Sequence, residues 1–133
     1  MFLQALKEMI ENKKFVIKFN RDFLNLKKKV YGVVNMEKKQ LVLKLDWETV
    51  YEEVSDYIRK QYKEQLIGPK ILAKLFDEYN LICFNQNGTT TMFWDKGNKK
   101  YCRVINFNVK KIPEIMQVLE KMRPAVYPPS GKY

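Results

Sequence analysis

Residues 80–108, NLICFNQNGTTTMFWDKGNKKYCRVINFN, contain two turn signals between three short apolar runs. Asn87-Gly88 accepts the positive φ angles of a tight hairpin turn, and Asp95-Lys96-Gly97-Asn98 is the second turn signal. The residues between the two turns are rich in β-branched and aromatic side chains, which suit a half-buried strand. The stretch therefore predicts an antiparallel meander with strands at about 81–85, 89–94 and 100–107.

The same meander interleaves lysines and an arginine with aromatic rings. Cations neutralise phosphates and rings stack on bases, so this mixture is typical of a nucleic-acid surface. The alternative is that the rings of Phe93, Trp94 and Tyr101 belong to the core and that the lysines only solubilise a turn. The exposure of these three rings decides between the two interpretations.

Helical and strand periodicities predict four helices and three further strands in the rest of the chain. The predicted helices are 2–12, 47–65, 69–79 and 113–122, and the predicted strands before the meander are 14–20, 30–34 and 40–46. Asp46 is the expected N-cap of the second helix. The element order is αβββα followed by αβββα, which predicts an α+β fold with about six strands of antiparallel sheet and four helices.

The repeated order leaves open an internal pseudo-duplication, because residues 11–20 and 77–85 both lead from a helix into a strand that ends in Phe-Asn. We expect a single domain over residues 1–122, with lobes 1–66 and 67–122 if the duplication holds. Residues 123–133 are expected not to continue the last helix and to form a flexible C-terminal tail. We expect neither a signal peptide nor a membrane span.

The formal net charge is +10, with 25 Lys+Arg against 15 Asp+Glu, which favours a polyanionic partner. The charge is uneven along the chain, because residues 1–46 and 81–133 each carry a balance of +6 whereas residues 47–80 carry −2. Only 4 of the 25 cations are arginine, the residue that suits bidentate reading of base edges. This predicts attraction to the phosphate backbone with little sequence readout.

Cys83 and Cys102 fall on the first and third strands of the predicted meander, roughly 9 to 10 Å apart and too far for a disulfide. Both are expected to be reduced, which is typical of an intracellular, cytoplasmic protein. The chain has no histidine, and this excludes His-based zinc sites and Ser-His-Asp triads. No cofactor and no metal site are predicted.

We interpret the sequence as that of a small, non-enzymatic, basic nucleic-acid-binding protein that favours single-stranded DNA or RNA. Lysines would contact phosphates and aromatic rings would stack on bases. The predicted site residues are Lys14, Lys18, Tyr31, Lys38, Lys39, Lys44, Trp94, Lys96, Lys99, Lys100, Tyr101 and Arg103. A homo-oligomer stays open, as does the choice between DNA and RNA.

Three other interpretations stay open. An accessory or inhibitory protein could dock on a protein or nucleoprotein partner, with residues 126–129 as an extended docking segment. Helices 47–65 and 69–79 with the basic hairpin could form a winged helix, although the second helix has few groups that read bases. Asp22 with Glu37-Lys38-Lys39 is similar to the acidic and lysine motif of metal-dependent nucleases, but Glu37 falls on a predicted turn.

Overall fold

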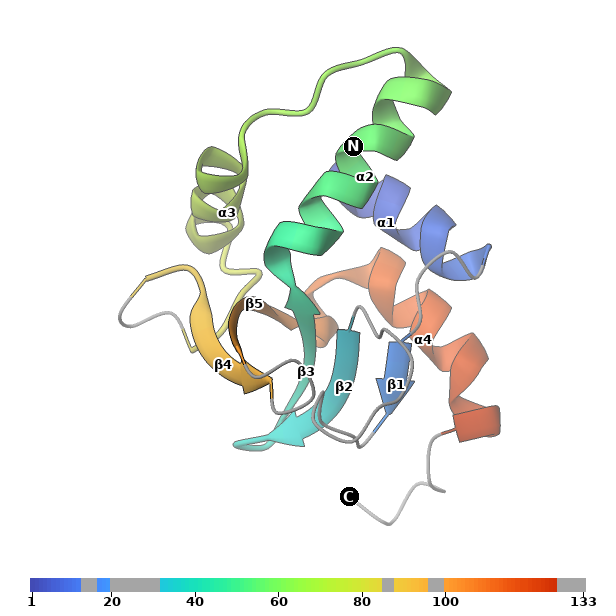
Figure 1. Cartoon of the computed structure of the whole chain (residues 1–133). Helices are drawn as coiled ribbons and strands as arrows, with labels where there is room; N and C mark the ends of the chain where they lie inside the picture. The colour runs from blue at the N-terminus through green and yellow to red at the C-terminus, as the bar shows by residue number, and fades with distance from the viewer. Residues whose placement is uncertain (13–16, 20–31, 85–87, 96–99, 127–133) are drawn as a thin grey trace.

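The computed structural model describes residues 1–12, 17–19, 32–84, 88–95 and 100–126, and at residues 18–19, 93–95, 100 and 122–126 it describes the backbone alone. These residues form four α-helices, five strands and a 3₁₀ turn (Figure 1). In chain order the elements are α1 (Phe2–Glu11), β1 (Ile17–Phe19), β2 (Gly32–Glu37), β3 (Gln40–Asp46), α2 (Trp47–Tyr62), α3 (Pro69–Glu78), β4 (Thr91–Asp95), β5 (Lys100–Asn108), η2 (Val109–Lys111) and α4 (Pro113–Val126).

The described strands form one sheet in the order β1-β2-β3-β5-β4. Three of the four pairings are antiparallel: β2 with β3, β3 with β5, and β5 with β4. The fourth is parallel and joins β1 to β2, with Ile17 opposite Gly32. Glycine is required at this crowded position, because a Cβ atom on Gly32 would lie 2.6 Å from Cδ2 of Leu45 and 3.0 Å from the Lys44 carbonyl oxygen. The predicted α+β class, with an antiparallel sheet and four helices, is confirmed.

The predicted strand at 81–85 differs from the structure. The described part of this segment makes one bridge, Ile82 to Phe107, flanked by hydrogen bonds from the Asn108 amide to the Leu81 carbonyl (2.8 Å) and from the Cys83 amide to the Asn106 carbonyl (2.9 Å). β3 already occupies the other edge of β5, so the segment pairs with the same edge of β5 as β4 does. It lies in line with β4 and is not a separate outer strand.

This arrangement corrects two predictions. The described residues form five strands and not six, and the segment equivalent to β1 in the second half pairs antiparallel with β5, whereas β1 pairs parallel with β2. The duplication is therefore not confirmed. Cys83 and Cys102 are not disulfide-bonded, as predicted, but no strand lies between their segments. Cys83 bonds to Asn106 of β5, which is four residues along the strand from Cys102, so the two cysteines are roughly 13 Å apart.

The main hydrophobic core lies between one face of the sheet and the helices. Alternate residues of the two central strands point into it and are 0 % exposed: Leu43, Leu45, Ile105 and Phe107. The Phe107 ring lies 5.2 Å from the Phe76 ring of α3, measured between centroids, and Phe76 lies 6.2 Å from Trp47 of α2. Packing of α2 and α3 on the sheet thus depends on one cluster of aromatic rings.

The opposite face of the sheet, which we call the second face, carries a smaller buried set of side chains: Val33, Val42, Val104 and Asn106. The three valines do not belong to the helix-covered core. Lys44 also lies on the second face, because it is paired with Val33 on one side and with Asn106 on the other. Burial on both faces explains why β3 and β5 contain adjacent apolar residues where a one-sided strand would alternate.

The helices begin at the predicted residues but end elsewhere, and α2 stops at Tyr62, three residues before the predicted residue 65. Asp46 precedes α2 as predicted, but its carboxylate accepts a hydrogen bond from the Thr49 hydroxyl (3.2 Å) and makes no side-chain bond to a backbone amide. α4 runs to Val126, so the prediction that the helix stops at residue 122 was wrong. Pro124 removes one backbone hydrogen bond, and α4 ends two residues later, so it interrupts only the last turn. Residues 127–133 of the predicted tail lie outside the described residues.

Glu8 on α1 is joined to α2 by the hydroxyls of two tyrosines and is also held by Gln4 of its own helix. Its carboxylate accepts from the hydroxyls of Tyr57 (2.7 Å) and Tyr62 (2.6 Å) and from the Gln4 amide (3.1 Å). The bond from Tyr62, followed by those from Tyr57 and Gln4, lowers the pKa of Glu8 below its usual 4.5. The same contact with the carboxylate raises the pKa of Tyr57 to about 12.

Replacing Glu8 with glutamine is expected to lower the free energy of unfolding at neutral pH by about 1–2 kcal/mol, because hydrogen bonds to a charged acceptor are the stronger kind. A carboxyl with a lowered pKa stabilises the fold above its unfolded value of 4.5 and loses this contribution as the pH falls through the folded value. The difference between wild type and variant should therefore shrink below pH 4.5 in urea unfolding. Glu53→Gln, an exposed change on α2, should alter stability by less than about 0.5 kcal/mol. A constant difference across this pH range would contradict the prediction.

Candidate functional site

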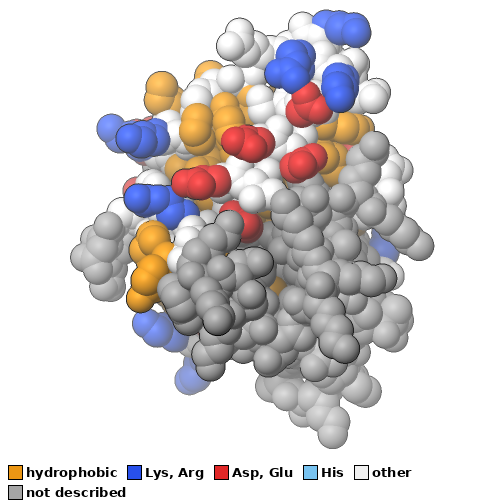
Figure 2. All heavy atoms as spheres, in the orientation of Figure 1, with side chains coloured by type: hydrophobic (Ala, Val, Ile, Leu, Met, Phe, Trp, Pro, Cys, Tyr) orange, Lys and Arg blue, Asp and Glu red, His pale blue; other side chains and the backbone are white. Residues whose placement is uncertain are grey.

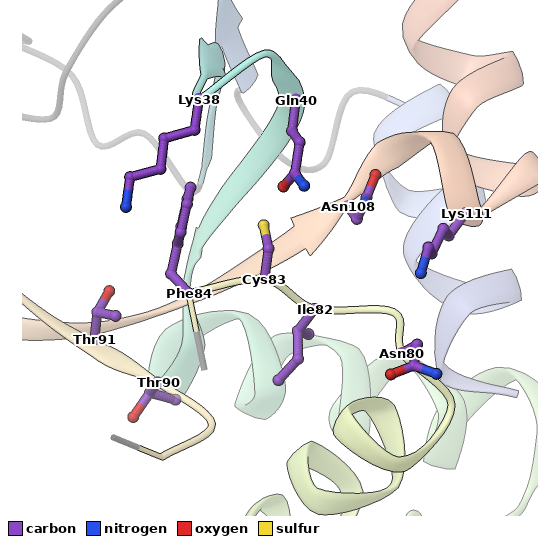
Figure 3. A pocket seen from close by; sticks show the side chains of 10 residues that line it. All are labelled: Lys38, Gln40, Asn80, Ile82, Cys83, Phe84, Thr90, Thr91, Asn108 and Lys111. Atoms are coloured by element: carbon purple, nitrogen blue, oxygen red, sulfur yellow. The ribbon is translucent and has the colours of Figure 1, made fainter. Parts of the chain in front are cut away.

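A cavity of about 490 Å³ lies on the second face, where the β2–β3 turn, the segment 80–84, the start of β4 and the end of β5 meet (Figure 3). Its lining is rich in neutral polar groups: the amides of Gln40, Asn80 and Asn108 and the hydroxyls of Thr90 and Thr91. Amides and hydroxyls both donate and accept hydrogen bonds. This second-face cavity suits a polar ligand.

Two lysines reach the cavity from different elements, Lys38 from the β2–β3 turn and Lys111 from η2. Figure 3 places them on opposite sides, with Gln40 and Asn108 between them. Neither lysine forms an ion pair with any residue in the described part of the chain. Their uncompensated charges favour an anionic ligand.

Phe84 supplies an aromatic ring to the wall of the cavity. The Lys38 ammonium lies 5.3 Å from the centre of this ring, and the Lys44 ammonium lies 5.7 Å from it. Lys44 also lies 3.0 Å from a carboxylate oxygen of Glu37, which compensates its charge. The cavity therefore brings cations and an aromatic ring together, but through Lys38 and Phe84 and not through the cations and rings predicted for the meander.

The backbone around the cavity adopts left-handed conformations at three lining residues, with φ angles of 50° at Lys38, 59° at Asn80 and 60° at Phe84. Lys39, with φ of 65°, completes the tight turn between β2 and β3. Asparagine tolerates this conformation, whereas for lysine and phenylalanine it costs about 1–2 kcal/mol. Strain of this kind clusters at binding and catalytic sites, which supports a function for the cavity.

Phe84→Gly is expected to unfold at a higher urea concentration than Phe84→Ala, with a difference of about 1 kcal/mol in stability. Both changes remove the ring and its contacts with Lys38 and Lys44, but only glycine also relieves the strain at a φ of 60°. The comparison therefore isolates the cost of the backbone conformation. Equal stability, or a more stable alanine variant, would show that position 84 is not strained.

Asn106 lies beside the cavity and is 1 % exposed. Its amide nitrogen donates to the Thr91 hydroxyl (3.2 Å), whereas its side-chain oxygen has no hydrogen-bond partner among the described residues. The Cys83 thiol donates to the Asn106 backbone carbonyl at 3.6 Å. Burial, reinforced by the nearby Glu37 charge, raises the pKa of Cys83. The thiol therefore stays protonated at neutral pH and is a poor nucleophile.

The structure places the predicted site residues in different regions. Lys38 lines the cavity, Lys39 is exposed beside it in the same turn, and Lys44 is partly buried on the second face. Tyr101 and Arg103 lie on β5. Three more are described by their backbone alone: Lys18 on β1, Trp94 on β4 and Lys100 on β5. The other four lie outside the described residues: Lys14, Tyr31, Lys96 and Lys99.

Tyr101 and Arg103 do not belong to the cavity. They alternate in register with Ile105 and Phe107, so they lie on the helix-covered side of the sheet, beyond the part that the helices bury. Tyr101 is 63 % exposed, and seven residues of β5, roughly 24 Å, separate it from Asn108. The predicted residues whose side chains the structure describes therefore divide between the two faces of the sheet.

Sequence reasoning missed Phe84 and Lys111 as site residues. Lys110-Lys111 lies just after the last strand, and a pair of lysines next to a strand, as at Lys38-Lys39, is a signal that could have identified it. Phe84 carries no such signal, because an aromatic residue in an apolar run is indistinguishable from core. Its role depends on the left-handed turn that the chain makes there.

The acidic residues gather on another part of the molecule. In Figure 2, Asp and Glu side chains cluster over α2, whose exposed residues include Glu48, Glu52 and Glu53. α2 packs on the helix-covered face of the sheet, away from the second face. The first half of α2 is therefore acidic, whereas its last turn carries Arg59 and Lys60.

Some classes of site are absent from the described part of the chain. It contains no group of three or more His, Cys, Asp or Glu residues placed to hold a metal ion. Of the nuclease-like motif, Asp22 lies outside the described residues and Glu37 pairs with Lys44. None of the described helices combines the length and the apolar character needed to cross a membrane. Comparisons of the chain with protein-family models, curated proteins and solved structures found no match.

Proposed function

We propose that the protein binds single-stranded nucleic acid on the second face of its sheet, with the second-face cavity at the centre of the interface. One observation carries this proposal: Lys38 and Lys111, neither paired with a described carboxylate, converge on a cavity that also holds amides and the Phe84 ring. Lysines supply the attraction to phosphates, and the ring and amides contact bases. Lys39 and Lys44 belong to the same surface, whereas Tyr101 and Arg103 do not.

The concave shape favours single strands over duplexes. Unpaired bases can enter a cavity, whereas the bases of a duplex stay stacked unless energy is supplied to flip them out. The scarcity of arginine, 4 of 25 cations, also argues against bidentate reading of a duplex groove. We therefore expect backbone-driven binding with a small dependence on sequence.

The distribution of charge orients the ligand. Exposed glutamates in the first half of α2 repel a polyanion from that helix, while the lysines of the β2–β3 turn and η2 attract it to the cavity. Steering of this kind is screened by salt. Binding should consequently weaken steeply as the salt concentration rises.

Fluorescence anisotropy with a labelled single strand of about 16 nucleotides, the upper end of single-site lengths, tests the proposal. We expect log K to fall with log[salt] with a slope of about −1.4 or steeper, since each neutralised phosphate contributes about −0.7. A duplex of the same length should bind more weakly. Absence of binding, or binding that does not respond to salt, would overturn the proposal.

A second candidate function is that of an accessory protein that docks on a protein partner. Two large apolar side chains are exposed on and next to α3, Ile71 on the helix at 62 % and Tyr79 directly after it at 72 %. Exposed apolar side chains that lie near one another can form part of a protein contact. Recovery of one stoichiometric protein from a nuclease-treated native extract, lost with Ile71→Asp, would support this function. Unchanged recovery with Ile71→Asp would exclude α3 as the contact.

A further inference from the structure

We infer that the second-face cavity holds one whole nucleotide of the bound strand, with its phosphate at Lys111 and the edge of its base against the amides of Gln40 and Asn108. The inference rests on the proposed function and names the unit of ligand that the cavity accepts. It specifies a bounded site, whereas a lysine surface alone predicts only a diffuse attraction to phosphate.

The size of the cavity fits this assignment. Its volume of about 490 Å³ lies within the range of roughly 300–1,000 Å³ that small-molecule and cofactor sites occupy. Most such sites are mainly apolar, but the amides and hydroxyls described above give this one a polar lining. An apolar ligand would leave those groups without hydrogen bonds. The occupant must therefore carry several hydrogen-bonding groups.

The two lysines of the cavity differ in the contacts that their ammonium groups already make. The Lys38 ammonium is engaged over the Phe84 ring at 5.3 Å, whereas Lys111 has no ion-pair partner among the described residues. Lys111 is therefore the better phosphate ligand. Figure 3 places Gln40 and Asn108 between Lys111 and the Phe84 ring, so a base bound there would lie between the phosphate site and the aromatic wall.

The amides identify the other part of the ligand as a base. A simple phosphate or carboxylate would satisfy the lysines but not the side chains of Gln40, Asn80 and Asn108, which need donors and acceptors together. Base edges present both kinds of group, and asparagine and glutamine pair with them in two hydrogen bonds. A sugar phosphate shares the phosphate and hydroxyl chemistry but lacks the base. The experiment must therefore distinguish these ligands.

Isothermal titration calorimetry of the full chain with each of the four ribonucleoside 5′-monophosphates, with ribose 5-phosphate and with adenosine provides the test. At least one nucleotide is expected to bind about tenfold or more tightly than ribose 5-phosphate and adenosine, the size of effect that one or two hydrogen bonds produce. Gln40→Ala and Lys111→Ala should each weaken this binding by about tenfold. The matched controls Gln117→Ala on α4 and Lys70→Ala on α3, both at exposed positions, should leave it unchanged.

The same samples are measured with the labelled single strand, which separates this inference from the proposed function. Strand binding without nucleotide binding, or nucleotide binding no tighter than that of ribose 5-phosphate, would overturn the cavity assignment and leave the proposed function intact. Nucleotide binding that depends on Gln40 and Lys111, without any strand binding, would support the cavity assignment and overturn the proposed function. Equal losses in the two control variants would also overturn the assignment.

Discussion

Replacing Phe107 with alanine is expected to lower the free energy of unfolding by about 3–5 kcal/mol, because it combines the loss of a buried ring with a cavity that the core cannot close. The side chain is 0 % exposed, and its ring lies 5.2 Å from that of Phe76. Its backbone pairs with Leu43 on one side and Ile82 on the other, so relaxation is restricted. Urea unfolding monitored by circular dichroism measures the change.

Tyr101→Ala is the matched control, since it removes a ring of similar size from the same strand and the same side of the sheet. Tyr101 is 63 % exposed, and its removal should cost no more than about 1 kcal/mol, the range of strand propensity. The pair of variants separates burial from strand propensity, because both replace an aromatic residue of β5. A similar loss for both would mean that the Phe107 ring is not the centre of the core.

Helix positions were predictable because each helix carries its own signals. The apolar spacing of Trp47, Val54 and Ile58 marks the buried face of α2, and all three are buried. Pro69 begins α3, as expected of a proline in the first turn. These signals act within a few residues, so no knowledge of the tertiary structure is needed to use them.

The pairing of the strands was predicted less well, because the residues of a strand do not identify the strand with which it pairs. The apolar run at residues 81–85 has strand composition, yet only Ile82 forms a bridge before the chain turns at Phe84. A positive φ at phenylalanine has no sequence signal, since glycine and asparagine are the usual residues there. The parallel pairing of β1 likewise depends on the crossover that returns the chain beside β2.

The candidate site was predictable only in part, for the same physical reason. Lys38, Lys39 and Lys44 were identified from their local pattern and lie on or beside the second-face cavity. Lys111 joins Lys38 only because β3 and β5 pair in the centre of the sheet, with Val42 opposite Asn108. Bringing residues about 70 positions apart to one cavity depends on sheet topology, which periodicity does not determine.

The double charge reversal Lys38→Glu with Lys111→Glu is expected to reduce affinity for the labelled single strand by a factor of about 100 or more at low salt. Each change removes one phosphate contact and adds a repulsive charge, and two lost charge-assisted contacts of about 1.5 kcal/mol each already exceed that factor. The slope of log K against log[salt] should become less steep by about 1.4. Anisotropy titrations at several salt concentrations measure both quantities.

The control is Lys70→Glu with Lys74→Glu, which makes the same change in net charge on exposed positions of α3. Both pairs lower the formal charge from +10 to +6 and weaken long-range attraction equally. Only the first pair removes the lysines of the cavity. If both double variants lose the same affinity and the same salt slope, binding depends on net charge alone and the second face is not the interface. A loss confined to Lys38 and Lys111 identifies the cavity as the place where the strand is held, because net charge is then constant between the two proteins and position is the only variable.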